Sequence, residues 1–260
     1  MALRSAKAAS EIRVPHFSSS VVMLTGSSLT RRFWAAALVT VVFTVLGRWL
    51  RGVSFSGSIA GAVICLVLYA AAGPGAFAAL VLVFVLTWAA TRFGYRRKQK
   101  LGTAESGEGR TASQVLANLA TAAVFAGASG VTERMVFLVA AVAALSEAAA
   151  DTVSSELGQA HSATARLITT WEVVPAGTDG GVSATGTIAG VVAAAMVSGV
   201  SLLAGLVPPR WAGISLIAGV AGMMVDSCLG SLFERRKLLN NDWVNFLSTL
   251  AAAGIALLLS

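Results

Sequence analysis

Long apolar runs separated by short polar connectors make up most of the chain. From residue 33 onward, the runs come close to the ~20 residues that a helix needs to cross a bilayer. These apolar windows cover residues 33–50, 55–72, 75–93, 112–129, 135–151, 182–206, 211–229 and 243–259. The pattern predicts an all-α, polytopic integral membrane helix bundle of about eight transmembrane helices. Window 112–129 contains Asn118 and Thr121, so seven spans are the alternative.

Composition supports this prediction. Hydrophobic residues make up 56% of the 260 residues and charged residues 12%, and the mean hydropathy is +0.79, values typical of a chain whose main solvent is lipid. Residues 33–260 therefore predict a single transmembrane domain in a lipid bilayer. Residues 1–32 are rich in serine and arginine and contain no apolar run long enough to span. They predict a flexible basic tail, and an organellar transit peptide is the alternative.

The net charge of +7 is distributed as a topology signal. Basic residues lie beside the ends of predicted spans and do not form a stripe with interleaved aromatic residues, so we expect no nucleic-acid partner. The positive-inside rule places the motif-bearing loops in the cytoplasm: 94–111, 152–181 and 230–242. We expect a bacterial inner (cytoplasmic) membrane protein, or a plastid envelope protein if residues 1–32 are a transit peptide.

Several acidic residues lie where apolar residues would be less costly in lipid. Glu147, Asp151 and Glu156 lie at the end of one predicted span, and Asp226 lies inside another. A carboxylate near the bilayer centre costs roughly 2.5–3.5 kcal/mol on insertion scales, so it normally faces a partner, a metal or a wet cavity. Glu147 and Asp151 are four residues apart, so on a helix their carboxylates share one face and repel unless a cation lies between them.

Hard oxygen ligands of this kind, without a soft ligand nearby, favour magnesium. Mg²⁺ usually binds through one or two carboxylates together with waters and substrate phosphates. We therefore assign Asp151, Glu156 and Asp226 to an Mg²⁺ cofactor, with Glu147 as a further candidate ligand. The alternative is that these acids cap a helix and pair with Arg166.

A second group of residues has the chemistry of a phosphate site. It combines an arginine, hydroxyl groups and glycines that let backbone N–H groups approach an anion, just before the N-terminus of a predicted span. Its members are Arg166, Thr169, Thr170, Gly177, Thr178, Gly180, Gly181 and Ser183. The sequence here is neither a Walker motif nor a dinucleotide fingerprint. A flexible Gly-rich connector is the alternative.

Further candidates for nucleotide or phosphate binding lie near the ends of other spans. They carry cationic, amide or hydroxyl groups: Lys98, Lys100, Arg110, Gln114, Asn118, Ser227, Asn240, Asn241 and Asn245. The basic side chains could equally contact anionic lipid headgroups, and the amides at 240–245 could cap the last helix.

Together these motifs resemble the family of integral membrane proteins called domain of unknown function 92. The family includes transmembrane protein 19 and the phytyl-phosphate kinase of vitamin E (tocopherol) biosynthesis. The resemblance covers about residues 33–260. It rests on Gln114-Val115-Leu116-Ala117-Asn118, Asp151-Thr152, Ser155-Glu156, Ile168-Thr169-Thr170, Gly180-Gly181-Val182-Ser183, Asp226-Ser227 and Asn240-Asn241.

The resemblance implies a membrane kinase that transfers a phosphoryl group from a nucleoside triphosphate to an isoprenoid monophosphate, such as phytyl phosphate. CTP is the candidate donor. Asp151, Glu156, Asp226 and Arg166 would be the catalytic residues, and the isoprenoid tail would lie among spans lined by glycine and alanine. An enzyme of this kind would bring the acids and residues 177–183 together at the cytoplasmic ends of the spans.

Two other functions fit the same residues. An ion- or proton-coupled transporter would place its acids near the bilayer midplane, with a broken helix beside them. A CTP-dependent polyprenol kinase or a cytidylyltransferase-like lipid enzyme would use a similar magnesium and nucleotide site, but a polyprenol kinase must also activate a hydroxyl group.

Overall fold

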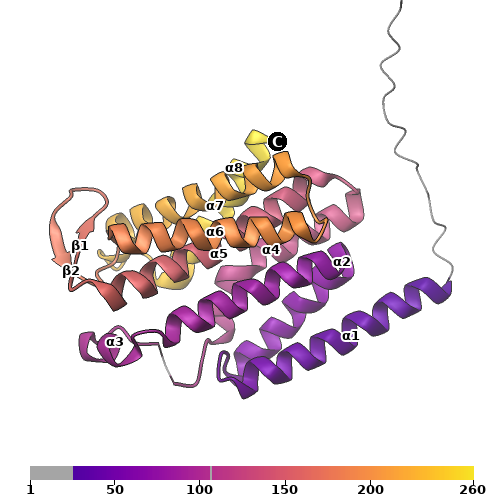
Figure 1. Cartoon of the computed structure of the whole chain (residues 1–260), viewed down its shortest axis with the longest axis horizontal. Coiled ribbons are helices and arrows are strands. Elements are labelled where there is room, and N and C mark those ends of the chain that lie inside the picture. The colour runs from indigo at the N-terminus through magenta and orange to yellow at the C-terminus, as the bar shows by residue number, and fades with distance from the viewer. Residues whose placement is uncertain (1–25, 106) are drawn as a thin grey trace, which may run out of the picture.

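The computed structural model describes residues 26–105 and 107–260 as a mostly helical bundle (Figure 1). Its long helices are α1 (Gly26–Trp49), α2 (Phe55–Arg92), α4 (Ala112–Thr132), α5 (Met135–His161), α6 (Ala184–Leu203), α7 (Pro209–Leu229) and α8 (Asn241–Leu259). Its short elements are helix α3 (Tyr95–Leu101), the π-helical turn η1 (Gly230–Glu234), and strands β1 (Thr164–Leu167), β2 (Val173–Pro175) and β3 (Gly181–Val182). The prediction of an all-α membrane bundle is confirmed.

Six of the described helices are long and apolar enough to cross a membrane, and α1 adds the shorter apolar segment Phe33–Trp49. One of the six, α2, has 38 residues and leaves helical geometry at Gly73, whose φ is 74°, directly before Pro74. The chain reverses direction at this point. As a result, Trp88 and Arg92 near the end of α2 lie close to Leu50, just before the start of α2, and donate hydrogen bonds to its carbonyl oxygen.

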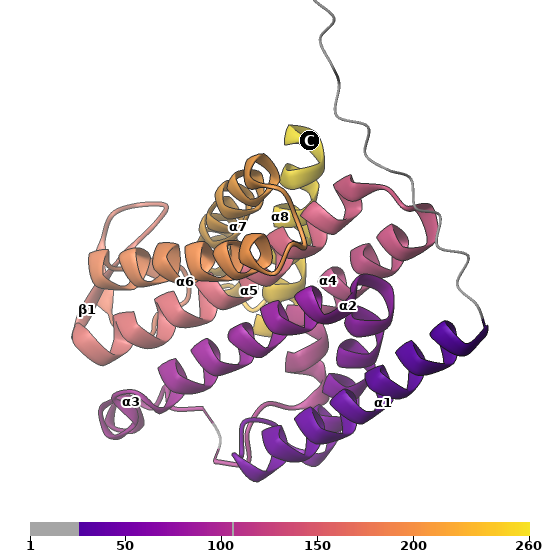
Figure 2. The same ribbon diagram turned by 45° about the vertical axis from the view of Figure 1, so that its right-hand side comes forward.

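Helix α2 is therefore a helical hairpin, and its two arms correspond to the predicted windows 55–72 and 75–93 (Figure 2). With the apolar segment of α1 and the five other long helices, the arms account for all eight predicted windows. Helix α1 begins at Gly26, inside the segment predicted to be a tail. The rest of that segment, 1–25, lies outside the described residues.

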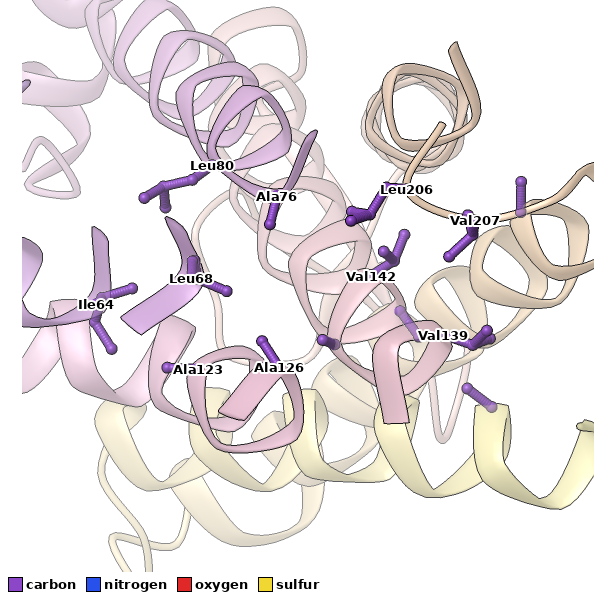
Figure 3. Packing of buried hydrophobic residues seen from close by; sticks show 14 of the residues in the cluster. Ile64, Leu68, Ala76, Leu80, Ala123, Ala126, Val139, Val142, Leu206 and Val207 are labelled. Atoms are coloured by element: carbon purple, nitrogen blue, oxygen red, sulfur yellow. The ribbon is translucent and has the colours of Figure 1, made fainter. Parts of the chain in front are cut away.

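Helix α5 lies at the centre of the bundle and is buried almost continuously from Val139 to Ala150. It packs against α2, α4, α6, α7 and α8. Small residues permit this close approach: a Cβ added to Gly219 of α7 would lie 2.7 Å from the side chain of Ser146 on α5. Figure 3 shows Val139 and Val142 of α5 among apolar side chains of neighbouring elements. Small residues let helices approach closely where lipid supplies no hydrophobic driving force.

The three loops that we predicted to be cytoplasmic meet at one end of the bundle. The predicted loop 152–181 is partly helical, since α5 continues to His161. The rest of it forms a small antiparallel sheet in the order β2-β1-β3. The turn after β1 contacts η1 through the hydroxyl groups of Thr169 and Ser231, which are 2.6 Å apart. This end of the bundle therefore gathers polar residues from distant parts of the chain.

Candidate functional site

Two adjoining polar cavities lie at this end. The first, which we call the acidic cavity, is lined by four carboxylates: Asp151 of α5, Asp179, Asp226 of α7 and Glu234 of η1. Among the described residues that line it, none is lysine or arginine. Asp151 and Asp226 both line this cavity, and Ser248 of α8 donates to Asp226 Oδ2 at 3.1 Å.

The glycine-rich segment 177–181 forms one wall of the acidic cavity. Gly177 and Gly180 have φ values of 86° and 73°, in the left-handed region that favours glycine. A Cβ on Gly180 would collide with the backbone of Ser231 in η1, and one on Gly181 would lie 2.8 Å from the Thr178 carbonyl oxygen. The segment is thus an ordered turn, and its packing against η1 requires glycine at position 180.

Asp179 lies in this turn, outside the spanning helices. Partial burial beside the cavity raises the pKa of its carboxyl above the usual value, and nearby Arg235 offsets part of the rise. The acidic cavity therefore opposes the accumulation of further negative charge.

The second cavity, which we call the amide cavity, contains one basic side chain, Arg110. The amide side chains in its wall are Gln114, Asn118, Gln159, Asn241 and Asn245. Arg110 donates to Thr152 Oγ1 at 3.3 Å. Gln159 Oε1 is buried without a hydrogen-bond partner. The cavity therefore offers one guanidinium to an anionic ligand, whereas Glu105, Asp151 and Glu156 in the same lining and the unpaired Gln159 oxygen suit a cation or a hydrogen-bond donor.

A shared wall joins the two cavities. Asp151, Ser155, Gln159 and Asn241 line both of them. The first three follow one another at four-residue spacing on α5, so they lie along one face of that helix. Ligands in the two cavities would therefore meet beside Asp151.

Lys98 and Glu156, which we predicted to bind phosphate and metal, instead bind each other. Lys98 is fully buried, and its Nζ donates to Glu156 Oε2 at 2.5 Å and to the carbonyl oxygens of Ala90 and Thr91 at 3.0 and 2.7 Å. These contacts use all three ammonium donors. Thr91 Oγ1 donates to the other oxygen of Glu156 at 3.0 Å. The predicted phosphate-binding role of Lys98 and the metal-binding role of Glu156 must therefore be corrected. The ion pair connects α3 to α5, and it engages the ammonium group of Lys98 and the carboxylate of Glu156.

Glu156 also lines the amide cavity, whereas several other predicted residues lie outside both cavities. Arg166 is exposed on β1 and donates to the Trp171 carbonyl oxygen at 2.9 Å. Its pairing with the acids, which was the alternative to a metal site, is not observed, since Lys98–Glu156 is the ion pair found within the described part of the chain. Thr170 and Lys100 are exposed, and Thr169 contacts Ser231.

Asn240 is the N-cap of α8, where its side chain accepts a hydrogen bond from the Trp243 backbone N–H at 3.0 Å. This is the capping role that we gave as the alternative for the amides at 240–245. Glu147 lies one turn before Asp151 and is 1% exposed, and its Oε1 has no hydrogen-bond partner. It does not line either polar cavity among their described residues.

Most remaining predicted residues do line a cavity. In the acidic cavity these are Asp151, Asp226, Gly177, Thr178, Gly180, Gly181, Ser183, Ser227 and Asn241. In the amide cavity they are Arg110, Gln114, Asn118, Asp151, Asn241 and Asn245. The sequence analysis placed Ser155 in a motif but missed Gln159 and Glu234. A continued helical period of four from Asp151 would have found Gln159.

The acidic cavity fits magnesium held jointly with a ligand. In residues 26–105 and 107–260, no three His, Cys, Asp or Glu side chains lie close enough to hold a metal ion by themselves. Asp151 and Asp226 nevertheless share one cavity with two further acids, and such a group of carboxylates is costly unless a proton or a cation is shared. Two carboxylates, with waters and phosphate oxygens completing the shell, are a typical Mg²⁺ set.

Comparison with known proteins identifies the family. The profile described as "Integral membrane protein DUF92" matches residues 38–253. The chain is 31% identical over 238 residues to Protein VTE6, chloroplastic, of Arabidopsis thaliana, covering 87% of this chain and 72% of that protein. An uncharacterized membrane protein of Methanocaldococcus jannaschii is 32% identical over 231 residues, covering 88% and 94%.

A further uncharacterized membrane protein, from Synechocystis sp., is 31% identical over 200 residues, covering 75% of this chain and 78% of that protein. No solved structure matches the chain. Because the family profile spans most of the transmembrane bundle, the chain belongs to the DUF92 family of integral membrane proteins.

Proposed function

We propose that the protein is a membrane prenyl-phosphate kinase. It transfers a phosphoryl group from a nucleoside triphosphate, with CTP as the proposed donor, to an isoprenoid monophosphate and releases the diphosphate. The similarity to Protein VTE6 and the resemblance to a family that includes phytyl-phosphate kinase support this class of reaction. The observation that carries the proposal is the shared wall, where the acidic cavity meets the amide cavity at Asp151.

The two cavities suit two different phosphorylated ligands. The acidic cavity has an ordered glycine turn but no lysine or arginine in its described lining, so a triphosphate would be repelled there unless a divalent cation came with it. Asp151 and Asp226 would hold Mg²⁺, which when bound neutralises phosphate charge. The amide cavity offers Arg110, whose guanidinium can bind a monophosphate with two parallel hydrogen bonds.

Phosphoryl transfer requires alignment and charge stabilisation more than covalent participation by the protein. A donor in the acidic cavity and an acceptor beside Arg110 would bring the reacting phosphates together at Asp151. The acceptor monophosphate is already an anionic nucleophile, so the site needs no dedicated general base. This separates the proposed reaction from that of a polyprenol kinase, which must deprotonate a hydroxyl.

The direct test is turnover by purified protein in lipid nanodiscs. Geranyl, farnesyl, geranylgeranyl and phytyl monophosphates would each be incubated with labelled CTP, ATP, GTP or UTP, with and without magnesium. We expect a labelled prenyl diphosphate that forms only when magnesium is present. Absence of transfer for every pair of substrates would overturn the proposal.

A transport assay separates this function from the transporter alternative. Asp226 lies three residues before the end of α7 and shares its cavity with loop residues, as an enzyme site at one end of the bundle requires. Sealed vesicles containing the protein should show no proton or cation flux. Flux that disappears in Asp226→Asn would support a transporter instead.

A further inference from the structure

A third cavity, which we call the apolar cavity, adjoins the amide cavity on the side away from the glycine turn. Large apolar side chains from α1, the second arm of α2 and α4 line it, including Phe43, Leu80, Phe84, Trp88 and Leu119. Phe43 and Phe84 pack edge to face within it, with ring centroids 5.3 Å apart. This lining differs from the glycine- and alanine-rich one that we expected for a lipid tail.

The apolar cavity has a cationic rim. Arg51, Arg92 and Arg110 line it, against one acid, Glu105. Arg92 is fixed in place, because its guanidinium donates to the Leu50 carbonyl oxygen at 2.6 Å and lies 4.8 Å from the centre of the Trp88 ring. An apolar cavity with three arginines at its rim matches an amphiphile that has one anionic head and one apolar tail.

The apolar and amide cavities adjoin each other, since Glu105, Arg110 and Asn118 line both. On the second arm of α2, the apolar lining extends from Arg92 to Leu80, which is about 18 Å along an α-helix. An acceptor could therefore place its tail in the apolar cavity and its phosphate at Arg110, facing the shared wall at Asp151.

We propose that the apolar cavity holds the tail of the isoprenoid monophosphate, and that Gly61, Leu80 and Phe84 determine which tail lengths are accepted. This inference rests on the proposed kinase function and assigns the acceptor to one side of the site. Bulk phospholipid is the alternative source of the same chemistry, a phosphate on an apolar chain.

Gly61 gives a way to fill the apolar cavity without disturbing the packing. It lines the cavity, and a Cβ built on it meets no atom within 4 Å. Gly61→Leu should therefore be tolerated by the helix and should extend into the cavity. Gly199 of α6 also has free space around its Cβ and lines none of the three cavities among their described residues. Gly199→Leu is the matched control.

The experiment measures equilibrium binding of labelled phytyl and geranyl monophosphates to protein in nanodiscs, without nucleotide. Gly61→Leu should weaken binding of the long phytyl chain by about tenfold, because the leucine takes the place of buried tail carbons, and should leave geranyl monophosphate within about twofold. Gly199→Leu should leave both within about twofold. Phytol, which lacks the phosphate, should bind wild-type protein at least about tenfold more weakly than phytyl monophosphate.

The outcomes distinguish this inference from the kinase proposal. If the chain-length effect is present but no nucleotide supports transfer, the tail site stands and the kinase function fails. If transfer occurs but Gly61→Leu affects neither ligand, or affects both equally, the tail assignment is overturned. Equal competition by excess phosphatidylglycerol would identify the cavity as an ordinary lipid site and would also overturn it.

Discussion

Two carboxylates on α5, Asp151 and Glu156, follow each other closely in the sequence but have opposite environments. Glu156 is buried against Lys98, and both of its oxygens accept hydrogen bonds. Asp151 shares the acidic cavity with Asp226 and forms no ion pair among the described residues, although Arg110 lines the amide cavity that Asp151 also lines. A paired buried acid stabilises the fold, whereas two adjacent unpaired acids can bind a cation. The charge opposite each acid therefore separates the structural carboxylate from the candidate catalytic one.

The largest expected effect comes from breaking the structural pair. Lys98→Met should lower the free energy of unfolding by about 3–5 kcal/mol, because it leaves Glu156 charged, buried and unpaired. Denaturation of the purified variants would measure this change. Lys100→Met, on the exposed side of α3, is the control and should shift stability by no more than about 0.5 kcal/mol. Replacing both partners, in Lys98→Met with Glu156→Leu, should recover most of the loss. If Lys98→Met proves as stable as the control Lys100→Met, the pair does not stabilise the fold.

Removing the charge of Asp226 should affect turnover and leave the fold intact. Asp226→Asn keeps the side-chain shape, so the variant should fold and still accept a hydrogen bond from Ser248. Its turnover should fall by about a hundredfold, equivalent to roughly 2.7 kcal/mol, because electrostatic stabilisation of the transferring phosphate is lost. Added magnesium should restore only part of the activity.

Asp242→Asn on α8 is the matched control for that substitution, since Asp242 lines none of the three cavities among their described residues. Its turnover should stay close to that of the wild-type protein. Comparable losses in the two variants would show that the effect of Asp226→Asn reflects a general loss of acidic charge.

Arg110→Gln should weaken binding of the lipid phosphate more than binding of the nucleotide. Loss of a charged hydrogen-bond donor is worth about 1.5–3 kcal/mol, so kcat/KM for the prenyl monophosphate should fall about ten- to a hundredfold. Steady-state kinetics should show a raised KM for the lipid and an almost unchanged KM for the nucleotide. Arg210→Gln, at the opposite end of the bundle, should change neither KM value. If Arg110→Gln instead raises the KM for the nucleotide, the nucleotide binds in the amide cavity and the lipid phosphate in the acidic cavity.

The spanning segments could be predicted from the sequence because a bilayer requires ~20-residue apolar runs. The turn of the α2 hairpin at Gly73 and Pro74 falls between two predicted windows. The end of α5 was predicted too early, at residue 151. Its last ten residues include several polar side chains that line the cavities, so a hydropathy criterion excludes this segment. Gln159 was missed for that reason.

The roles of the charged groups could not be predicted, because they depend on partners distant in the sequence. Lys98 and Glu156 are 58 residues apart, and no local spacing indicates that they pair. The three short strands contain four, three and two residues, too few for an alternating pattern to be recognised. Their formation turns Arg166 toward the Trp171 carbonyl oxygen and away from the acids with which it was grouped.

The smallest expected effect is that of replacing Arg166, and it tests whether Arg110 or Arg166 binds the phosphates. Arg110 is partly buried and lines both the amide and the apolar cavity, whereas Arg166 is exposed on β1 and lines neither. Arg166→Gln loses one surface hydrogen bond, an effect of about 0.5 kcal/mol or less, so kcat and both KM values should stay within about twofold of wild type. The same kinetic assay on Arg110→Gln and Arg166→Gln compares the two arginines directly. A hundredfold loss in Arg166→Gln with normal folding would mean that β1 and β2 move over the site during turnover and bring Arg166 to the phosphates.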